Sequence, residues 1–542
     1  MFVLMSLSRY YHTVKYLKSE QIFFQIFYKL SARLRRLFGL REKYVLYKHG
    51  NDIKFLPFPE KRESYKGDAT FEFLNLSHRF SGAWDDRSLG DLWRYNLNYM
   101  DFILQPGLDM HDAMSWIEDF IDAVPRNAIA SDPYPISLRG INWIKFLSKN
   151  RLDIPTEQLV KIDTFLYSQY RVLCKRTERH LLANHYLENG FSLLFAAVYF
   201  HDPTFWKKAK YIVESQLKEQ IMNDGAHYEL SPMYHCIILE RVIDCCNLLH
   251  CVDDTLFDGL TGLRTALCEK ASLMLAWLDA IVTKDGSIPL LNDSANGVAL
   301  SPAALREYAA RLGLKWDKGI LGDSGYRHVV SSHYEAILDM APLGASYNLG
   351  HAHADSSTFL LWVNGSELIV DTGTSTYNSG KKRDYERSTR AHNTVVVDDE
   401  NSSNVWGAFR CAQRARTIIK KDGPAVFAIE HDGYLSKGMN CNRCFVCNEN
   451  SFEIEDSVLG QNKFRVEAFF HLSPDVQVVS VEDNRVVTDR AVFSFEGHHS
   501  LHLSCVDVAT EYNLLSPSQC IQVCFTDKLH TTINGFGAIL GN

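Results

Sequence analysis

The stretch that decides the fold is LGHAHADSSTFLLWVNGSELIVDTGT, residues 349–374. Two apolar runs, STFLLWV and SELIVDT, flank the dipeptide Asn364-Gly365, which is a strong signal for a tight β-hairpin turn. The stretch therefore predicts an antiparallel hairpin. Just before it, His351 and His353 stand two residues apart, and on an extended segment they would face the same side. They are candidates for catalysts, for metal ligands or for polar residues at the edge of a sheet.

Downstream of the hairpin, short segments that alternate apolar and polar residues recur with polar turns between them. They include NTVVVDD, RARTIIKK, AVFAIEHDG, SFEIEDSV, FRVEAFFHL, VQVVSVED and RVVTDRAVFSF. Short strands at close spacing are typical of an antiparallel β-sandwich. The sequence therefore predicts a β domain over residues 326–542.

Upstream of the hairpin, apolar residues recur every three to four positions, which indicates amphipathic helices. The clearest of these segments are residues 159–173, 185–200, 236–252 and 267–282. Helix pairs repeated in this way build either a bundle or a closed ring of helical hairpins. We therefore predict a helical domain over residues 1–325. No low-complexity linker separates the two domains, and a site is expected in the cleft between them.

Composition and charge narrow the function classes. The chain has 542 residues, of which 46% are hydrophobic and 23% charged, with a formal net charge of -8. An acidic balance argues against a nucleic-acid-binding protein, and no apolar run reaches the roughly 18 residues of a membrane span. Residues 1–50, however, contain ten Lys or Arg and only two Asp or Glu. This basic segment indicates a solvated helix face, or contact with an anionic polymer or a membrane surface.

The N-terminus and the cysteines bear on the compartment. The segment MFVLMSLSRYYHTVKYLKSE lacks the basic start and the small-residue cleavage site of a signal peptide, so we expect a cytoplasmic protein, with a periplasmic one as the alternative. Thirteen cysteines without a spacing framework suit reduced thiols. Cys441, Cys444 and Cys447 in CNRCFVC alternate as in a strand and are interpreted as strand residues rather than metal ligands.

Two patches in the helical domain contain residues suited to catalysis. In LLANHYLENG, Asn184 and His185 stand at the start of a helix, where Asn184 could simply be the cap. In NDGAHYELSPMYH, Tyr234 follows Ser231-Pro232, which should begin a helix. A tyrosine in such a polar turn can transfer a proton if its environment tunes its pKa, although ordinary packing explains it equally well.

Two further patches contain possible metal ligands. The loop KDGSIPLLNDSANG, residues 284–297, is acidic but does not match a calcium-binding loop, and we interpret it as a structural loop that lines the cleft. His353, Asp371 and His392 lie on or beside strands that are expected to be neighbours. Two imidazoles and a carboxylate are a competent ligand set for Zn²⁺, whereas hydrogen-bonded histidines at a sheet edge are the alternative.

Taken together and in this order, the patches resemble the heparinase II/III family of polysaccharide lyases. The residues that carry the resemblance are LWRYNLNYMDF (92–102), YPISLRGINWIKFL (134–147), ANHYLENG (183–190), DGAHYELSPMYH (224–235), LLNDSANG (290–297), GHAHADSSTF (350–359), VDTGT (370–374) and RAHNTVVVD (390–398). The resemblance implies an α+β protein of two domains, an incomplete (α/α) toroid followed by an antiparallel β-sandwich. It also implies β-elimination at a uronic acid, with an anionic uronate-containing polysaccharide as the partner.

The same resemblance assigns roles to residues. Asn184 matches the asparagine that binds the substrate carboxylate, and His185 follows it as in the related alginate lyases, where the neighbouring histidine also works in the site. Tyr234 matches the catalytic tyrosine, and His351 matches a histidine that acts as a base or a carboxylate partner. Three residues match the ligands of a structural Zn²⁺, namely His353, Asp371 and His392. Four residues are expected to contact sugar, namely Trp93, Arg139, Trp143 and Glu229.

Other functions remain open at this point. A uronyl C5-epimerase could use the same histidine and tyrosine. A glycoside hydrolase with a helical ring would need two carboxylates, and Glu229 and Asp285 are the candidates. A non-catalytic sugar-binding protein is the third alternative. The net charge of -8 favours a polymer with little sulfation, and the N-terminal segment is similar to that of family members encoded beside bacterial capsule or exopolysaccharide genes. The oligomeric state is not predicted.

Overall fold

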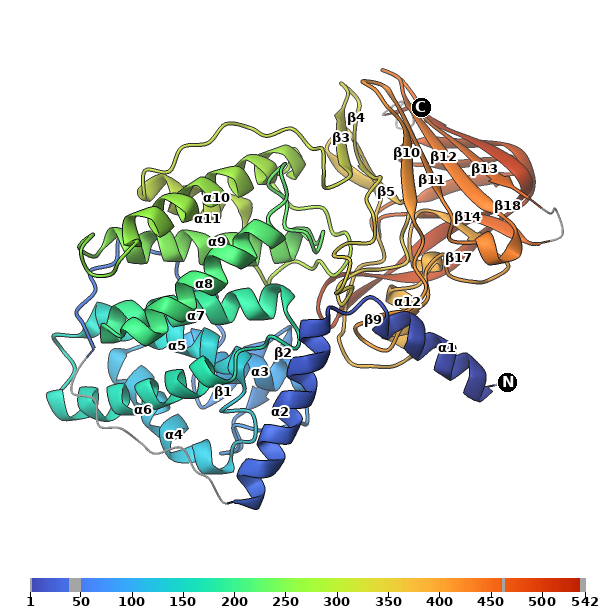
Figure 1. The fold of residues 1–542 in the computed structure, drawn as a ribbon. Helices are drawn as coiled ribbons and strands as arrows, with labels where there is room; N and C mark the ends of the chain where they lie inside the picture. Colours follow the sequence, from blue (N-terminus) through green and yellow to red (C-terminus); the bar gives the residue numbers. More distant parts are fainter. Residues whose placement is uncertain (1, 39–49, 461–463, 537–542) are drawn as a thin grey trace.

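The computed structural model describes residues 2–38, 50–460 and 464–536, which form a helical lobe followed by a β lobe (Figure 1). Two N-terminal helices, α1 (Phe2–Val14) and α2 (Ser19–Leu37), precede the helical lobe. The lobe itself is built from α3 (Asp91–Tyr99), α4 (Met110–Ala123), α5 (Pro133–Asn150), α6 (Thr156–Lys175), α7 (Ala183–Phe200), α8 (Pro203–Gln220), α9 (Pro232–His250), α10 (Leu260–Ile281) and α11 (Pro302–Arg311). The four helices expected from apolar spacing are present as α6, α7, α9 and α10.

Helix α7 is the centre of the helical lobe. It packs against α5, α6, α8 and α9, and all of its residues except His185 are buried. A helix that is apolar on nearly all sides belongs inside a domain. Gly190 lets α8 approach closely, since a Cβ at this position would lie 2.6 Å from Cγ2 of Ile212. Successive helices pack against one another along the chain, and the predicted α/α toroid followed by a β-sandwich is confirmed.

The β lobe contains two main sheets. The smaller sheet has the order β3-β4-β5-β6, with the strands Tyr326–Val330, Tyr334–Asp339, Phe359–Val363 and Ser366–Ile369. The larger sheet has the order β10-β11-β12-β13-β18-β17-β16-β15, and β14 pairs with both β18 and β7. Its strands are β7 (Val395–Val397), β10 (Thr417–Asp422), β11 (Val426–His431), β12 (Asn440–Cys447), β13 (Phe452–Leu459), β14 (Val466–His471), β15 (Val478–Glu482), β16 (Arg485–Thr488), β17 (Val492–Glu511) and β18 (Leu514–Asn534).

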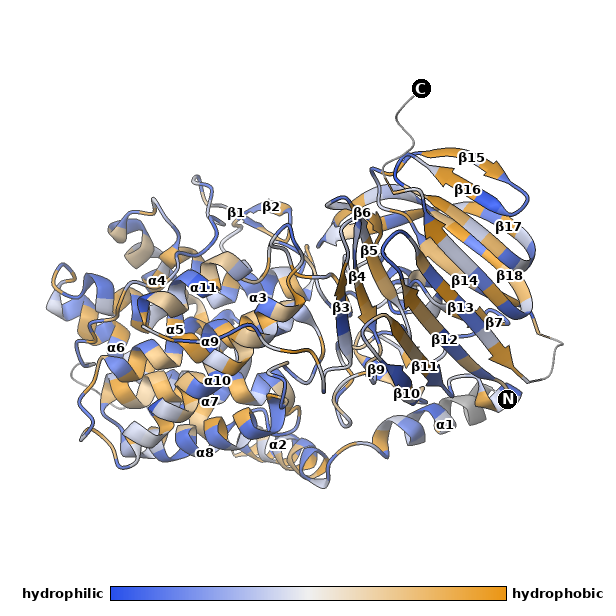
Figure 2. Ribbon diagram, turned by 90° about the horizontal axis from the view of Figure 1, so that it is seen from above, coloured by the Kyte–Doolittle hydropathy of each residue, from blue (hydrophilic) through white to orange (hydrophobic). Residues whose placement is uncertain are grey.

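The central strands of the smaller sheet, β4 and β5, are buried on both faces, and β5 packs into the cores of both lobes. In β5, Phe359 and Leu361 pack into the core shared with the larger sheet. Leu360 and Trp362, which point the other way, pack into the core of the helical lobe. A strand covered on both faces is apolar along its whole length rather than alternating. This explains the continuous run FLLWV, and Figure 2 shows the smaller sheet between the helices and the larger sheet.

The predicted hairpin of β5 and β6 is confirmed. Asn364 and Gly365 at its turn have φ angles of 49° and 83°, and positive φ at both central residues is what a type I′ turn requires. The strands pair in antiparallel fashion, with Val363 opposite Ser366. The chain direction therefore reverses within two residues, as the sequence indicates.

The structure differs from the sequence prediction in two places. A small hairpin of β1 (Thr70–Phe73) and β2 (Leu76–Arg79) lies inside the region predicted to be helical. The β lobe also contains, before β10, the short helix α12 (Lys381–Glu386) and a two-stranded antiparallel sheet of β8 (Val405–Trp406) and β9 (Arg410–Cys411). The cysteines of CNRCFVC lie on β12, and all thirteen cysteines are free thiols. Among the helices of the described residues, none combines the length and apolar character that crossing a bilayer requires.

Candidate active site

Asn184 lies at a strained helix start. Leu182 and Ala183 have φ angles of 58° and 52°, and no side chain caps α7. Asn184 is therefore not a cap. Its Nδ2 donates to Oε2 of Glu229, and its backbone N–H donates to Oε1, both at 3.1 Å. Left-handed backbone at two non-glycine residues costs about 1–3 kcal/mol each and is typical of functional sites.

His185, the next residue, is the more open member of this pair. Its side chain is 37% exposed, and its Nδ1 lies 3.3 Å from Oε1 of Glu178. Its ring packs on that of Tyr134, with 4.4 Å between the ring centroids. Burial alone would lower the pKa of His185, but the hydrogen bond to Glu178 and the negative charges of Glu178, Glu229 and Glu188 together outweigh it, and the pKa is raised. Surroundings that favour the cationic form of the imidazole suit an anionic ligand.

Tyr234 is positioned by the capped start of α9. Oγ of Ser231 accepts from the backbone N–H of Tyr234 at 3.2 Å, and Pro232 occupies the first helical position, as predicted. The Tyr234 ring lies against His351, with 3.9 Å between centroids. Its hydroxyl is 3.2 Å from that of Tyr377. Burial raises the pKa of Tyr234 well above its ordinary value, so the phenol is protonated at neutral pH.

Asp293 joins both histidines of the GHAHAD segment. Its Oδ2 is 2.9 Å from Nδ1 of His351, and its Oδ1 is 2.9 Å from Nε2 of His353. Arg383 donates to the same two oxygens at 2.6 and 2.7 Å in a bidentate pair. Burial would raise the pKa of Asp293, but Arg383 and the two histidines hold it well below its usual range. Asp293 is therefore an ionised, fully buried carboxylate.

The Asp293 loop is tied to the helical lobe by its neighbours. Nδ2 of Asn292 donates to the carbonyl of Leu230 at 3.1 Å, and its Oδ1 accepts from the backbone N–H of His353 at 3.0 Å. Oγ of Ser231 donates to the carbonyl of Asp293 at 2.8 Å. The start of α9, the Asp293 loop and the histidine segment thus form one connected unit.

The two histidines have different surroundings. The His351 side chain is 13% exposed, and its Nε2 lies 3.7 Å from Oε2 of Glu229, so Asn184 and His351 meet at that carboxylate, while Tyr234 packs on His351. His353 is fully buried. Since Asp293 accepts a hydrogen bond from the Nδ1 side of His351, the Nε2 nitrogen of His351 is the one available to a ligand.

The predicted metal ligands lie together behind this site. Nδ1 of His392 is 2.7 Å from Oδ2 of Asp371, and the rings of His353 and His392 are 5.2 Å apart. Nδ1 of His353 and Nε2 of His392 are buried without a hydrogen-bond partner, as free metal-binding nitrogens would be. In the part of the chain that the structure describes, no three His, Cys, Asp or Glu side chains are already arranged to hold a metal ion. Zinc binding therefore stays a prediction.

Three of the residues expected to contact sugar are instead structural. Arg139 is 1% exposed and donates to the carbonyls of Asn98 and Ala130. Trp143 is fully buried among helices, and Trp93 donates its indole N–H to the carbonyl of Leu76. All three residues lie on helices, and helix packing explains why these side chains are buried. Of the four residues, Glu229 alone is placed at the site, where it holds Asn184 rather than facing outward.

Sequence reasoning missed the residues that organise the site from a distance. Asp293 was interpreted as part of a structural loop, and Arg383 and Tyr377 were not selected. Arg383 is 90 residues from Asp293 in sequence, on the short helix α12. Since the pair forms only after the β lobe folds against the helical lobe, no local pattern indicates it.

Two family models match consecutive parts of this chain. The heparinase II/III N-terminus matches residues 142–311, and the heparinase II/III-like C-terminal model matches residues 313–534. A heparin-sulfate lyase of Bacteroides stercoris is 22% identical over 456 residues, which is 72% of this chain and 64% of that protein. A heparin-sulfate lyase of Pedobacter heparinus is 23% identical over 253 residues, or 41% of this chain and 38% of that protein. The chain therefore aligns with less than two thirds of the length of either relative.

A solved structure supports the fold. A heparinase III structure superimposes with a TM-score of 0.60 at 16% identity, covering 84% of this chain and 81% of that one. At this identity the likeness concerns the fold alone. The boundary between the two family models, near residue 312, falls between α11 and β3, where the helical lobe gives way to the sheets. With both halves matched in order, the chain belongs to the heparinase II/III-like family.

Proposed function

We propose that this protein is a polysaccharide lyase that cleaves a uronic-acid-containing polymer by β-elimination. The observation that carries the proposal is the packing of the Tyr234 ring, from the helical lobe, on the His351 ring, from the β lobe, with 3.9 Å between the ring centroids. Asn184 is linked to His351 through Glu229, which accepts from Nδ2 of Asn184 and lies 3.7 Å from Nε2 of His351. Tyr234 and His351, which are 117 positions apart in the sequence, thereby place an acid and a base side by side. The relatives described as heparin-sulfate lyases support the same reaction class.

The chemistry follows from the protonation states. Elimination removes the C5 proton of the uronate and breaks the C4–O4 bond, so a base must take one proton and an acid must return one to O4. His351 fits the base, because Asp293 accepts from its Nδ1 and leaves Nε2 to take the proton. Tyr234 fits the acid, because burial keeps its phenol protonated. The electron pair from the C5–H bond forms the C4–C5 double bond.

The charge that develops on the uronate carboxylate also needs partners. Asn184 and His185 stand at the start of α7, where an amide donor and a cationic imidazole can bind that carboxylate. Donors already fixed in place stabilise a developing enolate far better than water does. Glu229 is a positioning residue in this scheme, since it accepts both hydrogen bonds of Asn184.

The substrate is proposed to be a uronate polymer with little sulfation, such as a bacterial capsular or exopolysaccharide. The formal net charge of -8 supports this choice, because a protein that grips highly sulfated chains benefits from a basic surface. A matched panel of heparan sulfate, alginate and unsulfated capsular uronate polymers would rank the candidates by initial rate.

We further propose that His353, Asp371 and His392 hold a Zn²⁺ ion with a structural role. The unpaired nitrogens of His353 and His392 support this assignment. The bound ion would supply a fixed anchor for the segment that contains His351. Metal analysis of the purified protein should find about one zinc per chain, and His353→Ala should lose both the metal and the metal-dependent gain in melting temperature.

The proposed reaction has a direct test. A lyase produces a 4,5-unsaturated uronate that absorbs in the ultraviolet, whereas an epimerase produces no new chain ends but exchanges the C5 hydrogen with solvent deuterium. A hydrolase releases reducing ends without the chromophore, but it would need a second carboxylate, and Asp285 is engaged by Thr283 and Ser287 of its own turn. Chain cleavage without ultraviolet absorbance would refute the lyase assignment.

A further inference from the structure

Helix α2 is packed with its apolar side facing outward. The outer face of α2 consists of apolar side chains that are 39–76% exposed, namely Ile22, Phe23, Ile26, Phe27, Leu30, Leu34 and Leu37. At 100° per residue these positions fall on one continuous stripe. A surface helix of a globular protein normally turns such a stripe toward the core, so this arrangement needs an explanation.

The opposite side of α2 attaches the helix through polar groups. Nε2 of Gln21 donates to the carbonyl of Leu181 at 3.1 Å, and the hydroxyl of Tyr28 donates to the carbonyl of Thr177 at 2.7 Å. Glu20 pairs with Arg179 at 2.6 Å. The helix is therefore held on the helical lobe without using its outer face. Within residues 2–38, 50–460 and 464–536, that face stays exposed to solvent.

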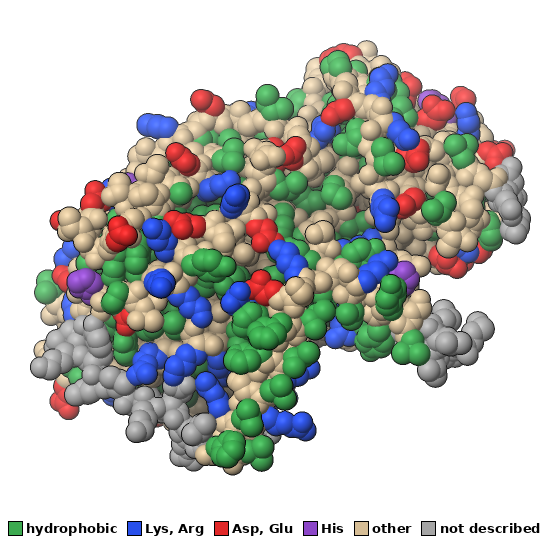
Figure 3. Space-filling model, in the orientation of Figure 1, with side chains coloured by type: hydrophobic (Ala, Val, Ile, Leu, Met, Phe, Trp, Pro, Cys, Tyr) green, Lys and Arg blue, Asp and Glu red, His purple; other side chains and the backbone are tan. Residues whose placement is uncertain are grey.

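The charges around the outer face indicate the partner. Lys29 and Arg33 are exposed one turn apart on its border, and residues 2–38 contain seven Lys or Arg and one Glu. Figure 3 shows the apolar surface of this region with Lys and Arg side chains beside it. A basic amphipathic helix with aromatic and leucine residues on one face is the pattern of helices that lie in the interface of an anionic bilayer.

Helix α1 repeats the arrangement on the same side of the molecule. Leu7, Tyr10, Tyr11 and Val14 follow i, i+3, i+4, i+7 spacing, and each is 46–67% exposed. The helix is tied to the β lobe by Trp406, whose indole N–H donates to Oγ1 of Thr13 at 3.2 Å and whose ring meets the Tyr10 ring edge-on, with 5.3 Å between the centroids. In Figures 1 and 2 both helices lie along one side of the protein. The two helices thus lie on one side of the molecule, α2 beside the helical lobe and α1 beside the β lobe.

We propose that α1 and α2 dock this protein onto the surface of an anionic phospholipid bilayer. Neither helix has the length and apolar character of a membrane span, which fits helices lying in the plane of the interface. A second copy of the chain would place two basic helices against each other. An anionic polysaccharide would account for the basic residues but would leave the apolar stripe exposed.

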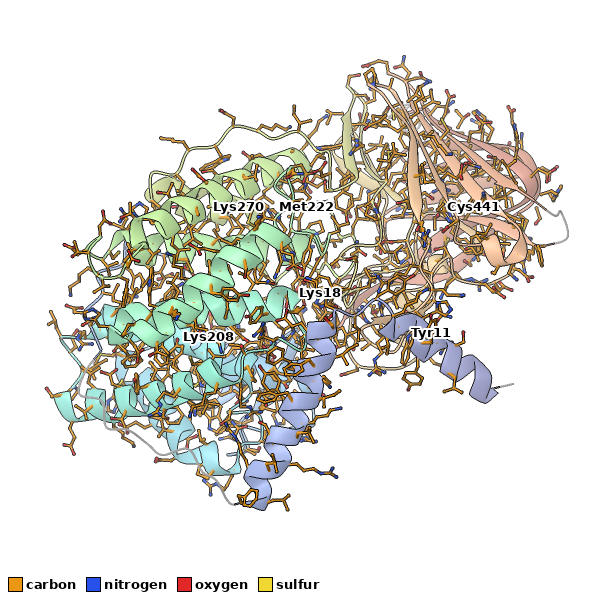
Figure 4. The ribbon with its side chains drawn as sticks, in the orientation of Figure 1. Tyr11, Lys18, Lys208, Met222, Lys270 and Cys441 are labelled. Atoms are coloured by element: carbon orange, nitrogen blue, oxygen red, sulfur yellow. The ribbon has the colours of Figure 1, made fainter. Side chains whose placement is uncertain are left out.

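The docking surface is joined to the candidate active site. Lys18, in the connection between α1 and α2, lies at the junction of the two lobes (Figure 4). Its ammonium pairs with Glu219 and stands 4.0 Å from the centre of the Tyr347 ring. The hydroxyl of Tyr347 is 2.6 Å from that of Tyr228, the residue next to Glu229. A bilayer bound by α1 and α2 would therefore hold the site at a fixed place relative to the membrane surface.

Vesicle sedimentation of the full chain tests the proposal. The wild type should sediment with vesicles of phosphatidylcholine mixed with phosphatidylglycerol and much less with phosphatidylcholine alone. Phe23→Glu/Phe27→Glu should lower the partition coefficient by at least about tenfold, because two apolar anchors are replaced by charges. Lys29→Gln/Arg33→Gln should lower it by on the order of tenfold on the anionic vesicles only. Leu152→Glu/Ile320→Glu, at positions 89% and 88% exposed elsewhere on the helical lobe, should leave it unchanged.

Three results would overturn the proposal. The wild type could fail to sediment with anionic vesicles, or the Phe23→Glu/Phe27→Glu variant could sediment equally well. Light scattering could instead show a dimer that this variant dissociates, with no vesicle binding by either protein, which would identify a second copy as the occupant. The test does not depend on catalysis, so its failure would leave the proposed lyase activity unaffected.

Discussion

The two halves of the candidate site are held in place by different means. On the helical side, Asn184 and Tyr234 stand within the first turns of α7 and α9, where backbone strain and a serine cap set their directions. On the β side, His351 is on an irregular segment whose position depends on the buried ion pair of Asp293 and Arg383. Local chain geometry therefore positions one half, and long-range electrostatics positions the other.

This difference predicts how the halves respond to substitution. On the helical side the side chains of Asn184 and Tyr234 are uncharged and each makes one hydrogen bond, to Glu229 and Tyr377, so truncating them should reduce activity much more than stability. The β-side network holds a fully buried charge, and breaking it leaves an unpaired ion in the interior. Substitutions there should reduce stability and activity together.

The largest effect is expected for Tyr234→Phe. Loss of the proton donor should reduce the rate of ultraviolet-detected cleavage by about 10²–10⁴. Stability should fall by only about 1 kcal/mol, because one hydrogen bond to Tyr377 is lost. Tyr211→Phe, at an exposed position on α8, is the matched control. Near-normal turnover of Tyr234→Phe would remove the tyrosine from the mechanism.

Arg383→Met should give the largest loss of stability. Removing one partner of a buried pair costs about 3–5 kcal/mol, here because the Asp293 carboxylate keeps its charge without its bidentate donor. Thermal and urea denaturation would measure the loss. Arg390→Met breaks the exposed pair with Asp399 and should cost no more than about 1 kcal/mol. Equal melting of the two variants would contradict the assigned role of the Asp293 network.

The same contrast explains how much the sequence predicts. Ser231-Pro232 indicates the start of α9 and places Tyr234, because capping and proline act within a few residues. The Asn-Gly turn likewise predicts β5 and β6. No local sequence pattern indicates Arg383 or Tyr377. The contact of Arg383 with Asp293 and that of Tyr377 with Tyr234 exist only in the folded protein. Sequence resemblance supplied His351, but only the structure shows that Asp293 orients it.

Local resemblance also misled where burial decides the role. Trp93, Arg139 and Trp143 are residue types that suit sugar binding, yet each lies in the packed interior. Their helices bury them because the neighbouring positions are apolar on several sides. The spacing of a single helix cannot distinguish a face that packs on another helix from one that lines a cleft.

Asn184→Ala should show the next smaller effect on activity. Loss of one fixed donor to a developing anion typically reduces turnover by about 10²–10³. Stability should change little, because the substitution removes only the side-chain hydrogen bond to Glu229. The backbone N–H of residue 184 still donates to Glu229. A lower kcat together with an unchanged melting temperature would support the role of Asn184 in binding the substrate carboxylate. A folding defect as large as that of Arg383→Met would place Asn184 with the structural residues.

Glu178→Gln should produce the smallest effect, a shift in pH dependence. Glu178 raises the pKa of His185 above the ordinary value of 6.5, so cationic His185 contributes stability that is fully present below about pH 6.5 and is lost as the pH rises through the folded-state pKa. If this cation binds the substrate carboxylate, kcat/KM should fall over the same rise in pH.

The Glu178→Gln variant keeps an oxygen that accepts from Asn189. In this variant the decline in stability and the decline in kcat/KM should both move to lower pH. Glu214→Gln, at an exposed position, should move neither decline. An unchanged pH profile in Glu178→Gln would show that the charge of His185 does not act in binding, and the helical half of the site would then rest on Asn184 and Tyr234 alone.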